Sequence, residues 1–469
     1  MSSLDFGIVI AYLAALTIVG FFKRHSGEVR AGDFIVGGRV TSLPAFVATL
    51  VATWYGGILG VGEFSYQYGL SNWLVFGLPY YIAAFLFAFL LAKKARESEL
   101  ISIPDRLAQA YGERAALVGS FMVFIVAVPA SYVLMIGVLF QILFGWSLVV
   151  GVLVGSLFSV VYLYSGGFRA VVRTDILHFS LMFAGFITLF TVLYFSYGGW
   201  DFLESHVPAQ NLTWHGGNSF WYIAIWYIIA LQTLIDPGFF QRCYAAKTPA
   251  VAKWGILVSV ACWVVFDFLT TSCGLYARAI LPDLADPSTS YPALAALVLP
   301  VGLVGLFAVA LLATVISTLE SYAFLAGATV GNDIMPRVTT VKPSQIMLYT
   351  RLGITLSLII SIALALFFQS VVNIWHALGS IATPTLLVPV LTTFVGNRRM
   401  PEKWAIVSMI CSGIVSLGWY LSKYINTDGS YWLELEPILP GIFFSVIIFV
   451  ATGRRLAKQT HANSVMIDG

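Results

Sequence analysis

Long apolar segments follow one another along the whole chain, and short polar connections separate them. About twenty consecutive apolar residues are what an α-helix needs to cross the hydrocarbon core of a bilayer. The pattern therefore predicts an all-α polytopic membrane protein with about thirteen transmembrane helices. The predicted spans are residues 5–22, 43–64, 71–92, 115–140, 146–165, 175–197, 219–240, 253–277, 294–326, 348–368, 371–395, 403–422 and 436–452.

The composition agrees with this class. The chain is 59% hydrophobic and 10% charged, whereas soluble domains carry roughly 25% charged residues. Its four cysteines fall in or beside apolar segments without metal-ligand spacing, so we expect reduced thiols. Residues 294–326 form an unusually long span, and we expect it to begin as a helix of an outer loop.

Basic residues gather in alternate connections between the predicted spans. If the amino terminus lies outside, 23 of the 25 Lys and Arg residues fall on the inner side, Arg242 among them, and Arg278 and Lys423 stay outside. Acidic residues dominate the outer connections 198–218 and 278–293. Because Lys and Arg are enriched in cytoplasmic loops, this distribution predicts an amino terminus outside and a carboxyl terminus inside.

The second span contains a glycine-rich stretch, residues 52–62, with the sequence ATWYGGILGVG. Glycine costs roughly 1 kcal/mol against alanine in a helix interior, so we expect a break near residues 54–57. In lipid, a broken helix needs protein, water or an ion to satisfy its backbone groups. The alternative is that the glycines only permit close packing of neighbouring helices.

A second interruption is predicted at Asp236, which begins the sequence Asp-Pro-Gly in the seventh span. Interrupted helices at matching positions of two halves indicate the binding site of a transporter, and here the second interrupted span comes five spans after the first. Glu63, Asp175 and Glu320 also lie within or at the ends of apolar spans. An ionisable residue there is a functional-site hypothesis by default. A gating hinge at Asp236 is the alternative.

Residues 313–321 carry a stripe of hydroxyl side chains on one predicted helix face. The members of the stripe, spaced by three or four residues, are Thr314, Ser317, Thr318 and Ser321. Such hydroxyls often bond back to carbonyls of the preceding turn. Opposite a broken helix, however, they offer the oxygen ligands that a hard cation such as Na⁺ prefers.

These pieces together resemble the sodium:solute symporter family. The similarity runs through AGDFIVGGR (31–39), SGGFRAVVRTD (165–175), QRCYAAK (241–247) and STLES (317–321), and spans roughly residues 30–400. It implies a single transporter domain with a five-plus-five inverted repeat of the LeuT type. The implied parts are an extra helix at 5–22, repeats at 43–197 and 219–395, two further helices within 403–452 and a cytoplasmic tail at 453–469.

The resemblance also implies the ligands of a sodium ion, position by position. The matching groups are the carbonyls of Ala52, Tyr55 and Thr314 and the hydroxyls of Ser317 and Thr318. Some members of the family bind a second cation with an acid of the RTD motif and later hydroxyls, and Asp175 and Ser321 match those positions. Glu320 stands where the family often has a hydroxyl or Asp, so a second ion or a proton stays open.

The implied solute site lies just past the first break and at the start of the QR-motif helix. The residues there are Trp54, Gly56, Gly57, Gln232 and Asp236. A carboxylate beside a Trp, which can add a cation–π contact, suits a small amine, amino acid or zwitterion. The alternatives are a sugar or organic anion as solute, and packing at the break as the role of Trp54.

Other classes of protein have less support in the sequence. The spans lack HExxH and GxSxG motifs, so no enzyme is expected. A non-transporting sensor on the same fold is the alternative to a symporter. We expect Na⁺ as the coupling ion, no organic cofactor, a small solute and the bilayer as partners, and a bacterial inner membrane as the location. No stretch indicates a nucleic-acid partner or an oligomeric state.

Overall fold

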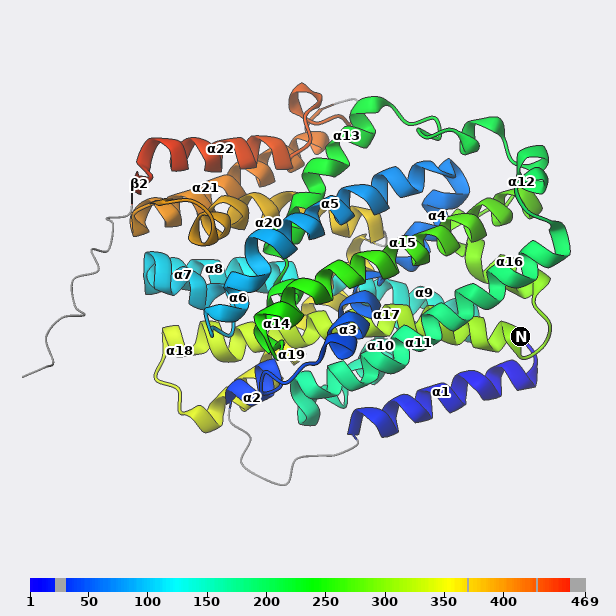
Figure 1. The fold of residues 1–469 in the computed structure, drawn as a ribbon, viewed down its shortest axis with the longest axis horizontal. Coiled ribbons are helices and arrows are strands. Elements are labelled where there is room, and N and C mark those ends of the chain that lie inside the picture. Colours follow the sequence, from blue (N-terminus) through cyan, green and yellow to red (C-terminus); the bar gives the residue numbers. More distant parts are fainter. Residues whose placement is uncertain (22–30, 369–370, 427–428, 456–469) are drawn as a thin grey trace, which may run out of the picture.

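A computed structural model describes residues 1–21, 31–368, 371–426 and 429–455. Helices make up most of these residues (Figure 1), which confirms the all-α prediction. Two short strands, β1 (Arg398–Arg399) and β2 (Arg454–Arg455), pair antiparallel. The cysteines Cys243, Cys262, Cys273 and Cys411 are free.

The first half of the chain is a series of helices, and the continuous helical segment Trp73–Glu97 contains two π-helical turns (η1 and η2). They are α1 (Ser3–Phe21), α2 (Ala31–Val36), α3 (Leu43–Trp54), α4 (Ile58–Tyr68), η1 (Trp73–Gly77), α5 (Leu78–Phe87), η2 (Ala88–Ala92), α6 (Lys93–Glu97), α7 (Ile103–Tyr111), α8 (Glu113–Ala127), α9 (Ala130–Phe144), α10 (Leu148–Val160), α11 (Leu163–Tyr197) and α12 (Trp200–His206).

The second half continues in the same way, with several short 3₁₀ turns and one π-helical turn (η6). Its elements are η3 (Ala209–Leu212), α13 (Phe220–Ile229), η4 (Ala230–Ile235), α14 (Pro237–Ala245), α15 (Pro249–Ile280), η5 (Pro287–Thr289), α16 (Ser290–Val298), α17 (Leu303–Ala328), η6 (Thr329–Ile334), α18 (Met335–Val338), η7 (Pro343–Gln345), α19 (Ile346–Phe368), α20 (Val371–Phe394), α21 (Glu402–Leu421), η8 (Ser422–Tyr424), η9 (Trp432–Glu434) and α22 (Ile438–Thr452).

The number of membrane spans depends on how strictly length is judged. Within the described ranges, ten helical segments are long and apolar enough to cross a membrane, and the bent pair α3–α4 makes eleven. The predicted spans 146–165 and 436–452 correspond to α10 and α22, which are apolar but shorter. Each of the thirteen predicted segments thus has a helical counterpart, but two fall below full spanning length.

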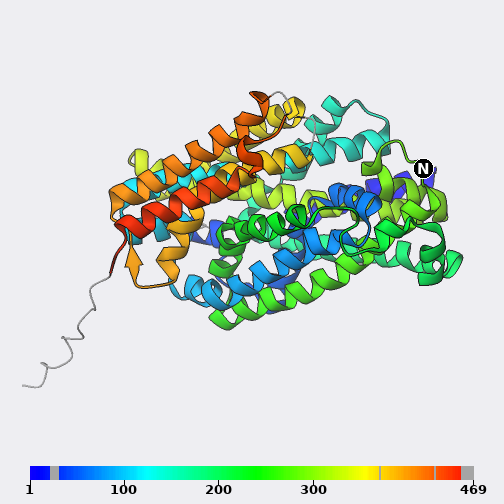
Figure 2. The same cartoon turned by 90° about the horizontal axis from the view of Figure 1, so that it is seen from above.

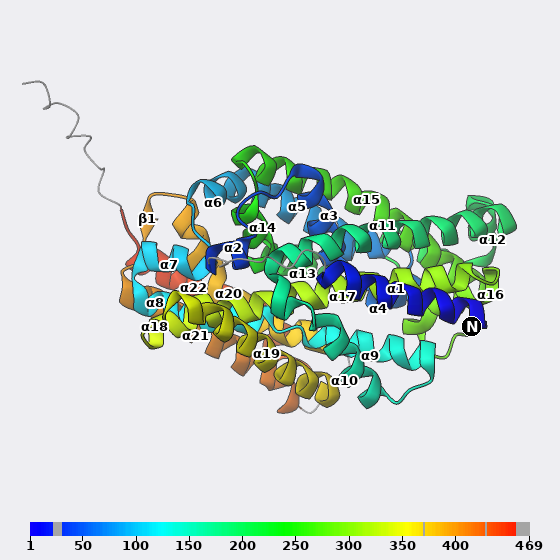
Figure 3. The ribbon, with the colours of Figure 1, turned by 90° about the horizontal axis from the view of Figure 1, so that it is seen from below.

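The helices form an elongated bundle, with the amino terminus and β2, the last element that the structure describes, at opposite ends of its long axis (Figures 1 and 3). The amino terminus lies at the end of the bundle where α16 is found, whereas β2 lies at the opposite end, next to α21 and α22 (Figure 1). Helices α20, α21 and α22 pack together along one side (Figure 2). The long predicted segment 294–326 is divided as expected, because α16 ends before Pro300 and α17 begins after Gly302.

The predicted break in the second span is confirmed. Helix α3 ends at Trp54, α4 begins at Ile58, and the two helices bend by 61°. Gly56 in the connection lies so close to α17 that an added Cβ would be 2.4 Å from the Thr318 Cβ. Both interpretations of the glycines therefore apply to Gly56, because it lies in the helix break and also permits close packing of the helices there.

The second predicted interruption is confirmed as well. Helix α13 tightens into the 3₁₀ turn η4, and Asp236 then takes an extended conformation with φ −66° and ψ 119°. Pro237 occupies the first turn of α14, where its missing N–H costs nothing. The residue before a proline is driven away from helical geometry, which explains why the chain breaks there.

Helix α17 is the central helix of the bundle. It packs against α1, α3, α9, α11 and α19, and most of its residues are buried. The hydroxyl stripe of residues 314–321 therefore cannot face lipid. The hydroxyls of Thr318, Ser317 and Ser321 contact α3, α11 and α14 respectively, whereas the Thr314 hydroxyl bonds within α17.

Candidate functional site

The first break and the hydroxyl stripe of α17 meet in the protein interior, as the sequence predicts. The Thr318 Oγ1 donates a hydrogen bond of 2.8 Å to the Thr53 carbonyl in the last turn of α3, and lies 3.3 Å from the Thr314 carbonyl. The Thr314 hydroxyl bonds back to the Ala310 carbonyl at 2.6 Å. The Thr318 hydroxyl is thus held between carbonyls of two helices, whereas that of Thr314 is satisfied within its own helix.

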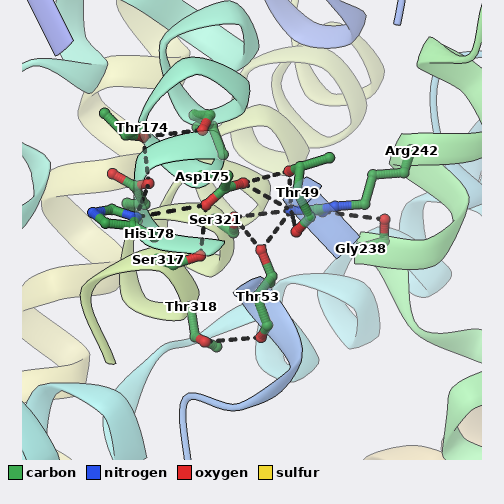
Figure 4. A network of polar contacts seen from close by, with 12 residues as sticks. Thr49, Thr53, Thr174, Asp175, His178, Gly238, Arg242, Ser317, Thr318 and Ser321 are labelled. Atoms are coloured by element: carbon green, nitrogen blue, oxygen red, sulfur yellow. Dashed lines mark hydrogen bonds and ion pairs between the residues drawn. The ribbon is translucent and has the colours of Figure 1, made fainter. Parts of the chain in front are cut away.

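Ser317, the other predicted hydroxyl ligand, faces a carboxylate. Its Oγ donates to the Asp175 Oδ1 of α11 at 2.5 Å, and both residues are fully buried. The second carboxylate oxygen, Oδ2, accepts from the Thr49 hydroxyl of α3. The predicted sodium ligands on α17 and the predicted second-cation acid Asp175 therefore belong to one connected group (Figure 4).

Arg242 corrects the charge analysis of the sequence. It does not lie in an inner loop but in α14, fully buried. Its Nη2 lies 3.6 Å from the Asp175 Oδ2 and donates to the Thr53 and Ser321 hydroxyls at 2.7 and 3.0 Å (Figure 4). A buried charge needs a partner of opposite sign, and Asp175 supplies it here.

Glu320 lies on the other side of Asp175, together with an imidazole that the sequence analysis missed. The Glu320 Oε1 accepts from the Thr174 hydroxyl at 2.6 Å, and its Oε2 accepts from the Tyr162 hydroxyl. The His178 Nδ1 lies 3.6 Å from the Glu320 Oε1 and 3.8 Å from the Asp175 Oδ1. These ligand atoms lie within 4.8 Å of one another and are buried, so they form a candidate cation site.

The residues that were predicted to bind a second cation therefore lie together only in part. Asp175 and Glu320 share the group with His178, whereas the Ser321 hydroxyl faces Arg242 and lies 3.0 Å from the Thr53 Oγ1. His178 stands three residues after Asp175, on the same helix face. That spacing is the signal in the sequence from which it could have been found.

Aromatic rings surround Trp54, the predicted solute residue on the first broken helix. Its ring stacks on Trp263 of α15 with centroids 5.0 Å apart, and contacts Tyr80 and Phe239 edge-on at 5.4 and 5.6 Å. Gln232 of η4 reaches the same group, because its Nε2 donates to the Tyr80 hydroxyl at 3.4 Å. Trp54 and Gln232 thus share the partner Tyr80.

Asp236 already has two partners in this structure. Its Oδ1 caps α14 by accepting from the Phe239 backbone N–H at 3.0 Å, and its Oδ2 accepts from the Tyr322 hydroxyl at 2.5 Å. A carboxylate at a helix N-terminus is stabilised by the helix dipole. The charge of Asp236 therefore has a structural partner, in addition to any group of the solute.

A further buried carboxylate, Asp267 of α15, escaped the sequence analysis. Its Oδ1 accepts from the Tyr55 hydroxyl at 2.9 Å, and its Oδ2 accepts from the Tyr81 hydroxyl. Tyr55, whose carbonyl is a predicted sodium ligand, is thus anchored by its side chain to α15. The sequence signal was an acid in the middle of the apolar span 253–277, the same signal that identified Asp175.

Comparison with known proteins identifies the family of the chain. The model of the sodium:solute symporter family matches residues 34–412. The chain belongs to the sodium:solute symporter family. Members of the family are transporters rather than enzymes, so the expectation of a non-enzymatic, multi-pass membrane protein is confirmed.

Curated relatives cover almost the whole chain. The chain is 26% identical over 479 residues to a sodium/pantothenate symporter of Escherichia coli (strain K12), with 95% of each chain covered. It is 24% identical over 485 residues to an osmoregulated proline transporter of Bacillus subtilis (strain 168), with 96% of this chain and 95% of the relative covered.

A solved structure of a Na⁺-coupled sialic acid symporter superposes with a TM-score of 0.78 at 18% identity. The match covers 97% of this chain and 100% of that one. A closed nucleobase-cation-symport-1 family transporter gives a TM-score of 0.58 at 12% identity, over 89% and 94% of the two chains. The chain therefore has the LeuT-type fold that was expected from its motifs.

Proposed function

We propose that this protein is a secondary active transporter that couples the entry of a small organic solute to the inward Na⁺ gradient by alternating access. The observation that carries the proposal is the contact between the two parts predicted to hold the ion. The break after α3 lies against the hydroxyl stripe of α17, and the Thr318 hydroxyl is bonded to the Thr53 carbonyl.

The proposed sodium ligands are the carbonyls of Ala52, Tyr55 and Thr314 and the hydroxyls of Ser317 and Thr318. Three features support them: Thr318 is wedged against Gly56, Ser317 is bonded to a carboxylate, and Tyr55 is anchored through its side chain. Neutral oxygens beside a buried carboxylate suit a dehydrated hard cation. Membership of a sodium-coupled family supports the choice of Na⁺.

The proposed solute site lies between the two broken helices and includes Trp54, Gly56, Gly57, Gln232 and Asp236. The aromatic rings around Trp54 and the carboxylate of Asp236 favour a small amine, amino acid or zwitterion. The relative that transports proline supports this class. The relative that transports pantothenate supports the alternative, an organic anion.

We further propose thirteen transmembrane segments with the amino terminus outside and the carboxyl terminus inside, in the plasma membrane of a bacterium. The opposite placement of the amino terminus and β2 supports an odd number of crossings (Figure 1). The division into an extra helix (5–22), two repeats (43–197 and 219–395), two last helices (403–452) and an inner tail (453–469) follows the fold of the family.

Uptake into proteoliposomes tests this function. Radiolabelled proline, pantothenate and a panel of amines and amino acids are offered to the purified protein with Na⁺ outside, and with K⁺ in its place as control. We expect one of these solutes to accumulate only with the Na⁺ gradient. Binding of a solute without accumulation under any gradient would favour a sensor on the transporter fold instead.

A further inference from the structure

Five oxygen atoms surround one nitrogen of the Arg242 side chain, its Nη2. They are the Thr53 Oγ1 at 2.7 Å, the Thr49 Oγ1 and the Ser321 Oγ at 3.0 Å each, the Thr49 carbonyl at 3.3 Å and the Asp175 Oδ2 at 3.6 Å.

This arrangement differs from ordinary hydrogen bonding. An NH₂ group of a guanidinium has two hydrogens and cannot donate to five oxygens at once. A shell of hydroxyl, carbonyl and carboxylate oxygens around one positive centre is the environment of a bound hard cation. The guanidinium is always charged, and Arg242 is fully buried. The group thus acts as a positive charge within an oxygen cage.

We propose that Arg242 is a tethered cation that fills the cation position between Asp175 and Ser321, so that the transporter binds one sodium ion and not two. The inference rests on the proposed sodium coupling and adds its stoichiometry to it. Ser321 is then a partner of Arg242 and not a ligand of a mobile ion.

The opposite flank of Asp175 is also occupied by side chains. Both oxygens of Glu320 accept hydrogen bonds, one from the Thr174 hydroxyl and one from the Tyr162 hydroxyl. The Asp175 Oδ1 is taken by the Ser317 hydroxyl. With Arg242 facing Oδ2, neither carboxylate has an oxygen that lacks a partner in this group.

Arg242 also links the ion-binding half of the molecule to the solute-binding half. While Nη2 faces α3, α11 and α17, its Nη1 donates to the Gly238 carbonyl at 3.3 Å. Gly238 lies two residues after Asp236 in the first turn of α14. A mobile ion would leave this position during each cycle, whereas a side chain keeps it filled.

The test counts sodium ions bound per molecule of purified protein by equilibrium binding of radiolabelled Na⁺. We expect one ion for the unmodified protein and one for Arg242→Lys, which keeps a charge in the cage. We expect two ions for Arg242→Gln, because the vacated oxygens then surround a position without a cation. The double variant Arg242→Gln with Asp175→Asn, which removes the carboxylate of the cage, should return to one.

The outcomes separate this inference from the proposed function. Two ions bound by the unmodified protein would overturn the inference and leave sodium coupling intact, and loss of one of them in Glu320→Gln would place the second ion beside His178. No bound sodium would overturn the proposed function itself. If the Arg242→Gln variant is folded, as shown by a cooperative thermal transition, but still binds only one ion, the inference is also overturned. If that variant does not fold, the count for the unmodified protein decides.

Discussion

Replacement of Thr318 by alanine probes the contact on which the sodium site depends. In the folded protein this hydroxyl is fully buried and donates to the Thr53 carbonyl at 2.8 Å. The change removes one oxygen ligand of the ion and leaves that carbonyl without its partner. An unsatisfied buried polar group costs about 1–3 kcal/mol, and each 1.4 kcal/mol corresponds to a tenfold change in affinity.

We therefore expect the Na⁺ concentration for half-maximal solute uptake to rise by about 5-fold to 150-fold in Thr318→Ala. Thr318→Ser is the matched control, because it keeps the oxygen and loses only the methyl group. The Na⁺ dependence of the serine variant should stay near that of the unmodified protein. Uptake is measured in proteoliposomes over a range of Na⁺ concentrations. An alanine variant that transports with unchanged Na⁺ dependence would refute the proposed site.

Three further expectations follow from the contacts. Gly56→Ala should abolish the rise in melting temperature that Na⁺ causes, because the new Cβ would lie 2.4 Å from the Thr318 Cβ. A rise equal to that of the unmodified protein would contradict this expectation. Asp175→Asn should lower the melting temperature strongly, since breaking a buried ion pair costs about 3–5 kcal/mol, whereas Lys93→Gln, in an exposed pair, should change it little. Asp236→Asn and Trp54→Ala should each weaken solute binding, measured on the protein in detergent, more than Na⁺ binding. If Asp236 serves only to cap α14, Asp236→Asn should leave the affinities for solute and for Na⁺ unchanged.

The two helix breaks could be read from the sequence because their causes are local. Gly56 and Gly57 weaken the helix at the position where they stand, and Pro237 excludes helical geometry from Asp236 before it. The hydroxyl stripe was equally visible, since it needs only the helical period. Its neighbours were not, because contacts between α17, α11 and α14 join residues more than sixty positions apart.

Arg242 shows most clearly what sequence patterns leave undecided. A basic residue at the end of an apolar segment is typical of a cytoplasmic loop, and nothing near it in the chain indicates a contact with the carboxylate of Asp175. That partner, Asp175, lies on a different helix. The lengths of two predicted spans could not be predicted from the sequence either. The sequences of α10 and α22 are apolar, but the lengths of these helices depend on tertiary packing and on caps such as Ser147.

The measurement that tests the central claim most directly is Na⁺ entry driven by the solute. Proteoliposomes with the purified protein receive radiolabelled Na⁺ outside, and a solute found in the uptake screen is then added. The account predicts that the solute accelerates Na⁺ entry, and that replacement of both Ser317 and Thr318 by alanine abolishes this acceleration while the protein still inserts and folds. Solute entry with no accompanying Na⁺ entry would contradict coupling through this site.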